Sequence, residues 1–391
     1  MRAVHRRLLL IGAVATSVGA AAALPVLADD PGPSLVNVAA AEGTPIPGQY
    51  IVTLKDGAST DSAAKKVRAA SVQRFDGVLN GFAAKLTGKQ LDQLRRDGRV
   101  AAIEQDQIVK ASGGTQHGPL PWGLDRIDQR KLPLSKSYKY GSMGRGVSAY
   151  VIDTGVDASH PQFGKRAASV WAAPQFKGNG NDCNGHGTHV AGILGSKTYG
   201  VAKEVKLRSL RVLGCDGSGP MSNLVAAAQW LRTHAQKPAV ANMSVGGPKS
   251  AALNTAVTNL SKSGVFVSVA AGNDGQDACK TSPASAGWVM TVGATTHKDT
   301  RPGWSNYGKC LDINAPGYYI TSTWPNGKSR VLDGTSMATP YVSGVAALYL
   351  TTHRGATFPQ VQKWLNANAT TGRIKGLPRG TVNRLLYKGN L

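Results

Sequence analysis

Three segments of the chain place side chains that do chemistry next to glycines. Asp153 directly follows an apolar run and precedes a glycine turn. His186 lies between two glycines at the start of an apolar segment, and Ser336 follows a Gly-Thr pair at the start of another. A serine hydroxyl is a weak nucleophile at neutral pH and needs an adjacent base. A carboxylate, an imidazole and a hydroxyl together would supply nucleophilic catalysis.

Each segment alone also has an ordinary structural interpretation. Asp153 could be a turn former, and Ser336 could be a simple helix N-cap. His186 and His189 are three residues apart, which is a conceivable metal pair. A metal site needs further ligands, and this segment offers only Asp182 and Cys183. The metal interpretation is therefore disfavoured, and the catalytic one depends on the three segments meeting in the fold.

The elements that must bring them together follow from hydrophobic spacing after residue 146. Apolar runs typical of buried strands alternate there with segments of helical spacing, which favours a mostly parallel sheet with helices on both faces. Catalytic groups in such sheets lie beyond the carboxyl ends of the strands. The expected strands are Gly146–Ile152, Val205–Val212, Ala239–Met243, Val265–Ala271 and Val289–Ala294. The expected helices are Ser222–His234, Ser250–Ser263, Met337–Leu350 and Phe358–Asn368.

A second, smaller pattern precedes this one. Its order of strand, helix, strand, strand, helix, strand is the ferredoxin-like α+β plan. The expected strands are Tyr50–Lys55, Val72–Phe75, Gly81–Leu86 and Val100–Val109, and the helices are Thr60–Ala70 and Thr87–Arg96. Thr60 or Asp61 would cap the first helix, and Gln90 lies at capping-box spacing from Thr87. Residues 29–48, rich in Ala, Pro and Gly, are expected to be a linker.

The first 28 residues have the pattern of a cleaved signal peptide. Three arginines and no acidic residue precede a short apolar run and a small-residue stretch. We therefore expect a secreted protein, and an oxidising compartment would permit disulfides. No stretch reaches 18 apolar residues, so we expect no membrane span.

The net charge of the chain raises an alternative function, which the distribution of charge and the low aromatic content then disfavour. The 391 residues contain 45 Lys and Arg against 22 Asp and Glu, a net charge of +23. Residues 29–110 carry a net charge of +1 and residues 111–391 a net charge of +19, which indicates two domains. A non-catalytic polyanion-binding protein is the alternative that this charge raises. The basic residues are scattered and only 6% of residues are aromatic, so nucleic-acid binding is disfavoured.

The order Asp, His, Ser along the chain is that of subtilisin. With the motifs VIDTGV, NGHGTHVAG, AAGN and GTSMATPYVSG, the sequence resembles the subtilisin-like serine peptidases, most closely the proteinase K and aqualysin group. YIVTLKDG and FDGVLNGFAAKLT resemble the inhibitor-type propeptide of these enzymes. The resemblance implies a signal peptide at 1–28, a linker at 29–48, a propeptide at 49–111 and a catalytic domain at 112–391.

The resemblance also implies the role of each catalytic residue. His186 would take the proton of Ser336 and later give it to the leaving amine, and Asp153 would fix the imidazole and stabilise its charged form. Asn273, in AAGN, would donate its side-chain amide to the oxyanion. The implied enzyme is a secreted serine endopeptidase that works without a catalytic cofactor and as a monomer.

Substrate contacts are implied in the same way. One strand edge would pair with the peptide backbone, and residues Leu213–Gly219 would form the facing edge. Small walls predict a roomy pocket with broad specificity that leans to apolar or aromatic residues. The pairing edge is Ser244, Val245 and Gly246, and the walls are Ala270, Ala271 and Gly272.

Four cysteines allow three pairings. Relatives of the aqualysin type imply a bridge from Cys183 to Cys215 and another from Cys279 to Cys310.

The resemblance also implies structural Ca²⁺. The matching ligands are Asp312 and the carbonyl oxygens of Gly287 and Val289. A turn-forming Asp312 without an ion is the alternative.

The propeptide is expected to act on its own enzyme. It would template the folding of the catalytic domain, which folds slowly because a parallel sheet depends on long-range contacts. Its last strand would then lie in the active site as a slow substrate, and autocleavage between about residues 110 and 117 would release the enzyme. Its partners would be this propeptide and protein or peptide substrates.

Overall fold

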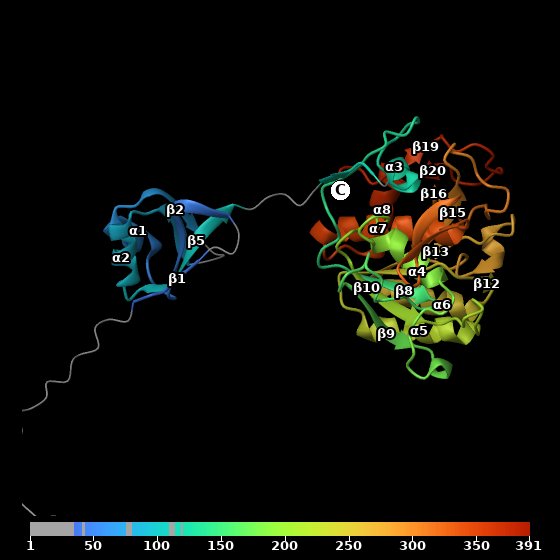
Figure 1. Ribbon diagram of the computed structural model, residues 1–391, viewed down its shortest axis with the longest axis horizontal. Helices are drawn as coiled ribbons and strands as arrows, with labels where there is room; N and C mark the ends of the chain where they lie inside the picture. Colours follow the sequence, from blue (N-terminus) through green and yellow to red (C-terminus); the bar gives the residue numbers. More distant parts are fainter. Residues whose placement is uncertain (1–34, 41–43, 76–79, 109–113, 119) are drawn as a thin grey trace, which may run out of the picture. The chain divides into compact units, whose positions relative to one another are not determined.

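The computed structural model describes residues 35–40, 44–75, 80–108, 114–118 and 120–391 (Figure 1). The chain divides into two compact units, residues 1–110 and 111–391. The expected signal peptide lies outside the described residues. Among those residues, no helix has the length and apolar character required to cross a bilayer.

The N-terminal unit contains one five-stranded sheet and two helices. Its strand order is β1-β5-β2-β4-β3, and every neighbouring pair except β1 and β5 is antiparallel. The last four strands of that order form the ferredoxin-like sheet that the sequence predicts. The elements are β1 (Val38–Ala39), β2 (Thr44–Leu54), α1 (Thr60–Val67), β3 (Ala70–Phe75), β4 (Gly81–Lys85), α2 (Gly88–Arg95) and β5 (Val100–Ile108).

Three expectations for this unit are wrong: the linker, the end of the first helix and its N-cap. The supposed linker contains strand β1 and the first residues of β2, both paired with β5, so the sheet begins earlier than its apolar pattern suggests. Helix α1 ends at Val67 because Arg68 adopts a left-handed conformation, and its N-cap is Ser59. The capping box between Thr87 and Gln90 is present as expected. Val109, the expected end of the last strand, lies outside the described residues.

The catalytic unit is built on a nine-stranded sheet. Neighbouring strands are parallel, except that β19 and β20, at one edge of the sheet, are antiparallel. Every strand that the sequence predicts is present, with ends shifted by at most two residues. In spatial order the strands are β19 (Thr370–Thr371), β20 (Arg384–Leu385), β16 (Ile313–Pro316), β15 (Met290–Thr295), β13 (Val265–Ala270), β11 (Ala239–Met243), β8 (Ser148–Asp153), β10 (Lys206–Arg211) and β9 (Ala167–Ala172).

Helices cover both faces of this sheet, and strand alternation explains how. Along β8, Ala149 and Val151 point into a core shared with helices α4, α7 and α8, while Tyr150 and Ile152 point into a core shared with α5 and α6. The helices are α3 (Trp122–Ile127), α4 (His186–Gly195), α5 (Met221–His234), α6 (Ala251–Lys262), α7 (Thr335–Thr352) and α8 (Phe358–Asn368), with short 3₁₀ turns η1 (Pro174–Phe176) and η2 (Ala278–Lys280).

Three two-stranded ladders lie outside the sheet, and the sequence analysis did not predict them. They are β6 (Gly114–Gln116) with β7 (Tyr138–Tyr140), β12 (Gly247–Pro248) with β14 (Thr281–Ser282), and β17 (Ile320–Trp324) with β18 (Lys328–Leu332).

Both predicted disulfides are present. Cys183 is bonded to Cys215, and Cys279 is bonded to Cys310.

Candidate active site

The carboxylate of Asp153 lies at the carboxyl end of strand β8, as expected for a functional group of a parallel sheet. The residue is completely buried. Its Oδ1 accepts a hydrogen bond from the backbone N–H of Thr154 and another from Nδ1 of His186, each 2.7 Å long. Because an ionised carboxylate only accepts hydrogen bonds, His186 carries its proton on Nδ1 and leaves Nε2 free to act as a base.

Glycines bring the histidine helix within reach of this carboxylate. His186 is the first residue of α4, and Gly185 before it has φ of 109°. A β carbon on Gly187 would lie 2.0 Å from the carbonyl oxygen of Gly155 and 3.1 Å from Cβ of Asp153. Glycine at position 187 is therefore required for the close approach of α4 to β8.

The environment of His186 raises its pKa. Burial disfavours the charged imidazolium, but the charge of Asp153 and its hydrogen bond outweigh that effect and raise the pKa of His186. Its side chain stays 27% exposed, so it faces the cavity.

Asp182 organises the approach to His186, and the sequence analysis considered it only as a metal ligand. Its side chain is buried and accepts five hydrogen bonds. They come from the Thr154 hydroxyl, the backbone N–H groups of Asn184 and Gly185, and both the N–H and the hydroxyl of Thr188. Asp182 thus joins the turn after Asp153 to the first turn of α4.

The nucleophile candidate Ser336 is the second residue of the long helix α7 and is half-buried. Its Oγ donates to the carbonyl oxygen of Ser244 at 2.9 Å. Among the hydrogen bonds of the described residues, none joins Ser336 to His186. Catalytic hydrogen bonds are often long or poorly aligned in a free enzyme and tighten when substrate binds.

Two N–H donors converge next to Ser336. The side chain of Asn273 accepts from the N–H and the hydroxyl of Thr335 through Oδ1, at 2.8 and 2.9 Å, so its Nδ2 faces the other way. A β carbon on Gly334 would lie 3.6 Å from both Asn273 Nδ2 and the Ser336 nitrogen. Both N–H groups therefore lie next to Gly334, where the expected oxyanion hole would form. Thr335, which orients the amide, was not identified from the sequence.

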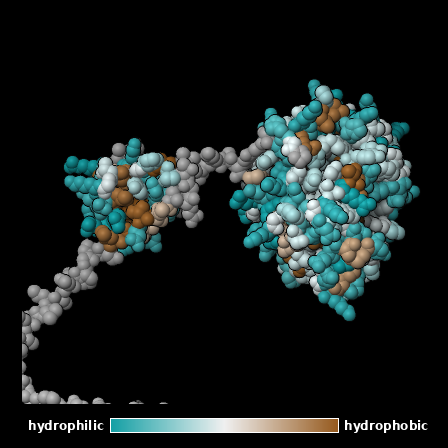
Figure 2. All heavy atoms as spheres, viewed as in Figure 1, coloured by the Kyte–Doolittle hydropathy of each residue, from teal (hydrophilic) through white to brown (hydrophobic). Residues whose placement is uncertain are grey.

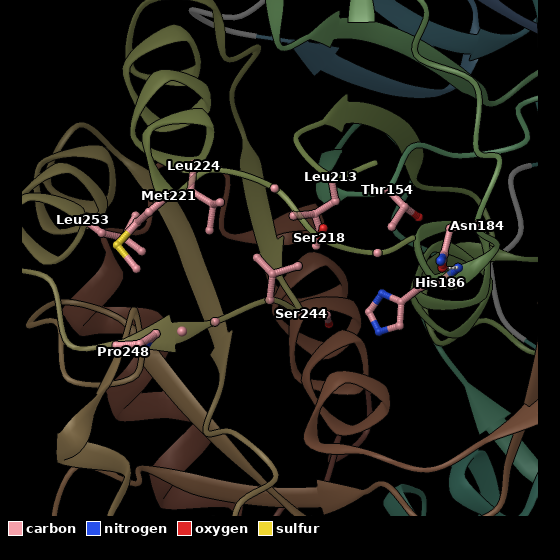
Figure 3. A pocket seen from close by; sticks show the side chains of 15 residues that line it. Thr154, Asn184, His186, Leu213, Ser218, Met221, Leu224, Ser244, Pro248 and Leu253 are labelled. Atoms are coloured by element: carbon pink, nitrogen blue, oxygen red, sulfur yellow. Dashed lines mark hydrogen bonds between the residues drawn. The ribbon is translucent and has the colours of Figure 1, made fainter. Parts of the chain in front are cut away.

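Two adjoining cavities of about 560 and 570 Å³ are lined by His186 in the first and by Asn273 and Ser336 in the second. The two cavities share residues 244–248. The first has His186 at one end and Met221, Leu224 and Leu253 at the other, with Ser244 between them (Figure 3). Leu213 and residues 217–219 line its wall, so the two expected strand edges face one cavity. The sequence pattern does not indicate this apolar end, because Met221, Leu224 and Leu253 lie on α5 and α6, where they resemble ordinary core positions.

The second cavity contains Ser336 and Asn273. Ala270 and Gly272 line it as expected. Ala271 does not fit the expectation, because its side chain is fully buried in a small cluster with Ala278, Ala284 and Leu311. Strand alternation turns it away from its neighbour. Polar residues that the sequence analysis did not assign also line the wall: Asp274, Gln276 and Lys280.

His189 lies elsewhere than a metal pair would require. Its Nε2 lies 3.0 Å from the carbonyl oxygen of Arg330 on β18, and the ring is completely buried. Burial lowers its pKa to about 4. Among the described residues, no group of three or more His, Cys, Asp and Glu side chains could hold a metal ion.

Asp312, the expected calcium ligand, directly precedes β16 and is half-buried. Its Oδ2 accepts the N–H of Thr291 at 2.8 Å, and its Oδ1 has a long contact of 3.4 Å with Gln362. Burial raises the pKa of Asp312 to about 6. The carbonyl oxygen of Gly287 accepts from the hydroxyl of Thr258 at 2.8 Å. A half-buried carboxylate with a weakly partnered Oδ1 fits a hard cation, and the Gly287 carbonyl oxygen retains a second lone pair for one.

Comparison with known proteins agrees with the fold and the site. Residues 144–384 match the Subtilase family, and residues 49–112 match Peptidase inhibitor I9. Alkaline serine exoprotease A of Vibrio alginolyticus is 47% identical over 80% of this chain, which spans 59% of that protein. The extracellular serine proteinase of Thermus sp. (strain Rt41A) is 46% identical over 88% of this chain and 90% of its own.

A solved structure shows the same fold. A cold adapted subtilisin-like serine proteinase superposes with a TM-score of 0.68 and 49% identity, covering 69% of this chain and 98% of its own. Fold and site thus define a subtilisin-like serine endopeptidase with an inhibitor-type propeptide. The chain belongs to the subtilase family, within which its relatives include enzymes of the proteinase K and aqualysin type.

Proposed function

We propose that this endopeptidase cleaves peptide bonds with Asp153, His186 and Ser336 through an acyl-enzyme. The observation that carries the proposal is the 2.7 Å bond from His186 Nδ1 to Asp153, at the wall of a groove that continues to Ser336 and two convergent N–H donors. The non-catalytic polyanion-binding alternative has no comparable feature.

The geometry supports a definite sequence of steps. The Ser336 hydroxyl turns from the Ser244 carbonyl to Nε2 of His186, gives up its proton and attacks the scissile carbonyl carbon. Asn273 Nδ2 and the Ser336 N–H stabilise the oxyanion. The imidazolium, held by Asp153, protonates the leaving amine, and an acyl-enzyme remains. His186 then deprotonates a water molecule that hydrolyses this ester.

Substrate would lie between the two cavity edges. Ser244, Val245 and Gly246 would pair with its backbone, opposite Leu213 and the following loop. Small walls at Ala270 and Gly272 support a broad preference that leans to apolar and aromatic residues before the cut. Profiling with a peptide library checks this preference, which Asp274 and Lys280 at the same wall would modify.

Calcium would support the structure rather than the chemistry. Asp312 and the carbonyl oxygens of Gly287 and Val289 would hold the ion and tie the start of β16 to the loop before β15. Calcium would supply positive charge to a half-buried carboxylate there.

We further propose that the protein is exported as a zymogen. The N-terminal residues carry a signal-peptide pattern, and the I9 segment would inhibit the enzyme until autocleavage between about residues 110 and 117. The relatives compared above include an enzyme named extracellular.

One experiment tests nucleophile, export and processing together. Secreted wild-type protein and the Ser336→Ala variant are compared by intact mass, N-terminal sequencing and casein cleavage. Wild type should be shortened, active and blocked by a serine-directed phosphonylating reagent. Ser336→Ala should be inactive and keep its propeptide. Casein cleavage by Ser336→Ala would reject the mechanism.

A further inference from the structure

The backbone carbonyl of Ser336 lacks its usual helical partner. In an α-helix the carbonyl of one residue accepts the N–H of the residue four positions later. The residue four positions after Ser336 is Pro340, which has no N–H. The nucleophile residue therefore has a carbonyl oxygen that the helix itself cannot satisfy.

Ser244 supplies the missing donor. Its Oγ donates to the Ser336 carbonyl at 2.7 Å, while Ser336 Oγ donates to the Ser244 carbonyl at 2.9 Å. The two residues thus form a reciprocal pair between helix α7 and the segment after β11. Ser244 is only 3% exposed, so water does not compete freely for these groups.

A buried polar chain fixes the direction of the Ser244 hydroxyl. Nδ2 of Asn242 donates to Ser244 Oγ at 2.9 Å, and Oδ1 of Asn242 accepts from Ser343 Oγ at 2.9 Å. Ser343 in turn bonds to Ser268 on β13. Asn242, Ser343 and Ser268 are completely buried.

This series of hydrogen bonds begins at Ser336 on helix α7 and returns to the same helix at Ser343. Ser343 lies seven residues after Ser336, about two turns along α7 and on the same face. Polar groups buried in an apolar sandwich are costly unless each has a partner, and a satisfied network rigidifies its surroundings. Here the network fixes α7 against β11, directly beneath the nucleophile.

We propose that the side chain of Ser244 is a positioning group for the nucleophile, held in direction by Asn242. This inference rests on the proposed function, in which the backbone of Ser244 belongs to the substrate-binding edge. One residue then sets both where the peptide lies and where Ser336 lies. The Ser244 side chain thereby links the position of the nucleophile to the edge that would bind the peptide.

The Ser244→Ala variant tests this directly, because it keeps the carbonyl and the strand edge and removes only the hydroxyl. We expect kcat to fall about tenfold, since small misplacements of reacting groups are costly. KM should change less than twofold. The acid-limb midpoint of kcat/KM should not move, because the bond between Asp153 and His186 is untouched. Ser244→Thr should restore kcat.

A second substitution separates positioning from simple hydrogen-bond satisfaction. Pro340→Ala returns an N–H to the helix, so in the Ser244→Ala background it gives the Ser336 carbonyl a partner again. The double variant should regain thermal stability without regaining kcat. Ser343→Ala, which loosens Asn242, should lower kcat about threefold even if Ser244→Ala folds poorly.

The matched control is Ser261→Ala on α6. This buried serine has a hydroxyl without a partner among the described residues, so its loss should leave kcat unchanged. An unchanged kcat in Ser244→Ala, a rise in KM alone, or recovery of kcat in the double variant would each overturn the inference. Failure of the proposed function looks different, because wild type would then resist the phosphonylating reagent or Ser336→Ala would cleave casein.

Discussion

Gly187 decides how closely helix α4 approaches the strand that ends at Asp153. Thr335 decides which way the amide of Asn273 faces. Neither residue has a part in the proposed chemistry, yet each fixes the position of a group that does. At this scale the site depends on short contacts and on individual hydrogen bonds.

The acid limb of activity should report the pKa of His186. The base must be neutral, so kcat/KM of the free enzyme falls as pH drops through that pKa. Because Asp153 raises it, the midpoint should lie above 6.5, the ordinary histidine value. Asp153→Asn should shift the midpoint down and lower kcat by roughly 10⁴-fold. A wild-type midpoint below 6.5 would contradict the proposed pair.

Loss of the oxyanion donor should affect the transition state selectively. Asn273→Ala should lower kcat by about 10²–10³-fold with little change in KM, because the donor acts on charge that develops only during reaction. Thr335→Val removes one of the two bonds that orient the amide and should cause a smaller loss in the same direction. Steady-state kinetics on a peptide amide measure both. An equal rise in KM would place Asn273 in ground-state binding instead.

At the scale of elements, the loop before α4 and the facing edge of the cavity are joined covalently. The disulfide between Cys183 and Cys215 adjoins Asn184, whose side chain donates to the Cys215 carbonyl and accepts the N–H of His186. This bridge thus connects the base to the edge at Leu213.

Removing that bridge should cost stability and binding together. Replacing both cysteines by alanine should lower the free energy of unfolding by about 3–4 kcal/mol on the chain-entropy account. KM for peptides should rise, because the facing edge loses its tie. Denaturant unfolding and kinetics measure the two effects. The variant lacking Cys279 and Cys310 is the control for loss of stability alone. An unchanged KM in the variant lacking Cys183 and Cys215 would show that this bridge does not hold the substrate-binding edge in place.

Calcium, if bound at Asp312, should stabilise most at alkaline pH. The folded-state pKa of about 6 exceeds the ordinary 3.8, so the stabilising contribution of protonated Asp312 is complete below 3.8 and lost as pH rises through 6. Without a cation, ionisation then costs about 3 kcal/mol. Calcium should therefore raise the melting temperature more at pH 8 than at pH 5, and chelation should reverse it. In Asp312→Asn the effect of calcium on the melting temperature should no longer differ between pH 8 and pH 5. If the difference persists in this variant, the ion is bound elsewhere.

The elements also show what the sequence could and could not predict. Long apolar strands such as Ala239–Met243 and the helix Phe358–Asn368 were predicted with their observed ends, because burial on both faces leaves a strong pattern. The ladder of β17 and β18 was missed, because β18 is exposed at four of its five positions, three of them polar or charged, and so has no apolar period. Ala271 was wrongly expected to line the pocket, because the motif AAGN does not indicate which way each side chain points.

The same contrast holds in the site. Asp153, His186 and Ser336 could be proposed from the sequence because their motifs are long, but Asp182 and Thr335 act through local hydrogen bonds that no motif spacing reveals. The reciprocal pair of Ser244 and Ser336 spans 92 residues of sequence and is visible only in the folded chain.

On the scale of the whole molecule, the charge belongs to the catalytic unit. Residues 111–391 carry a net charge of +19 and residues 29–110 only +1. Hydrophilic residues cover most of the face of the catalytic unit that Figure 2 shows, with apolar residues in separate patches. A diffuse positive surface of this kind favours solubility and attraction to anionic walls or acidic proteins.

The division into two units narrows the expected processing window. Residues Gly114–Gln116 belong to the catalytic unit, where β6 pairs with β7. Gln116 donates to the carbonyl of Thr198 at 3.1 Å and accepts from Nζ of Lys203 at 2.8 Å. The same Nζ lies 3.0 Å from the carbonyl oxygens of Lys197 and Gly200, and Lys203 is half-buried. A cut after Gln116 would remove strand β6 from its ladder with β7. It would also remove one of the hydrogen-bond acceptors of Lys203 Nζ.

Autocleavage should therefore fall before Gly114, and the mature chain should begin between residues 111 and 114. N-terminal sequencing of active secreted enzyme measures this, with Ser336→Ala as the unprocessed control. Gln116→Ala should lower the melting temperature of the mature enzyme without moving the cut, because the residue anchors the new end rather than directing cleavage. A fully stable enzyme that begins at His117 or later would show that β6 contributes nothing, and that the boundary between the two units is not where the chain is processed.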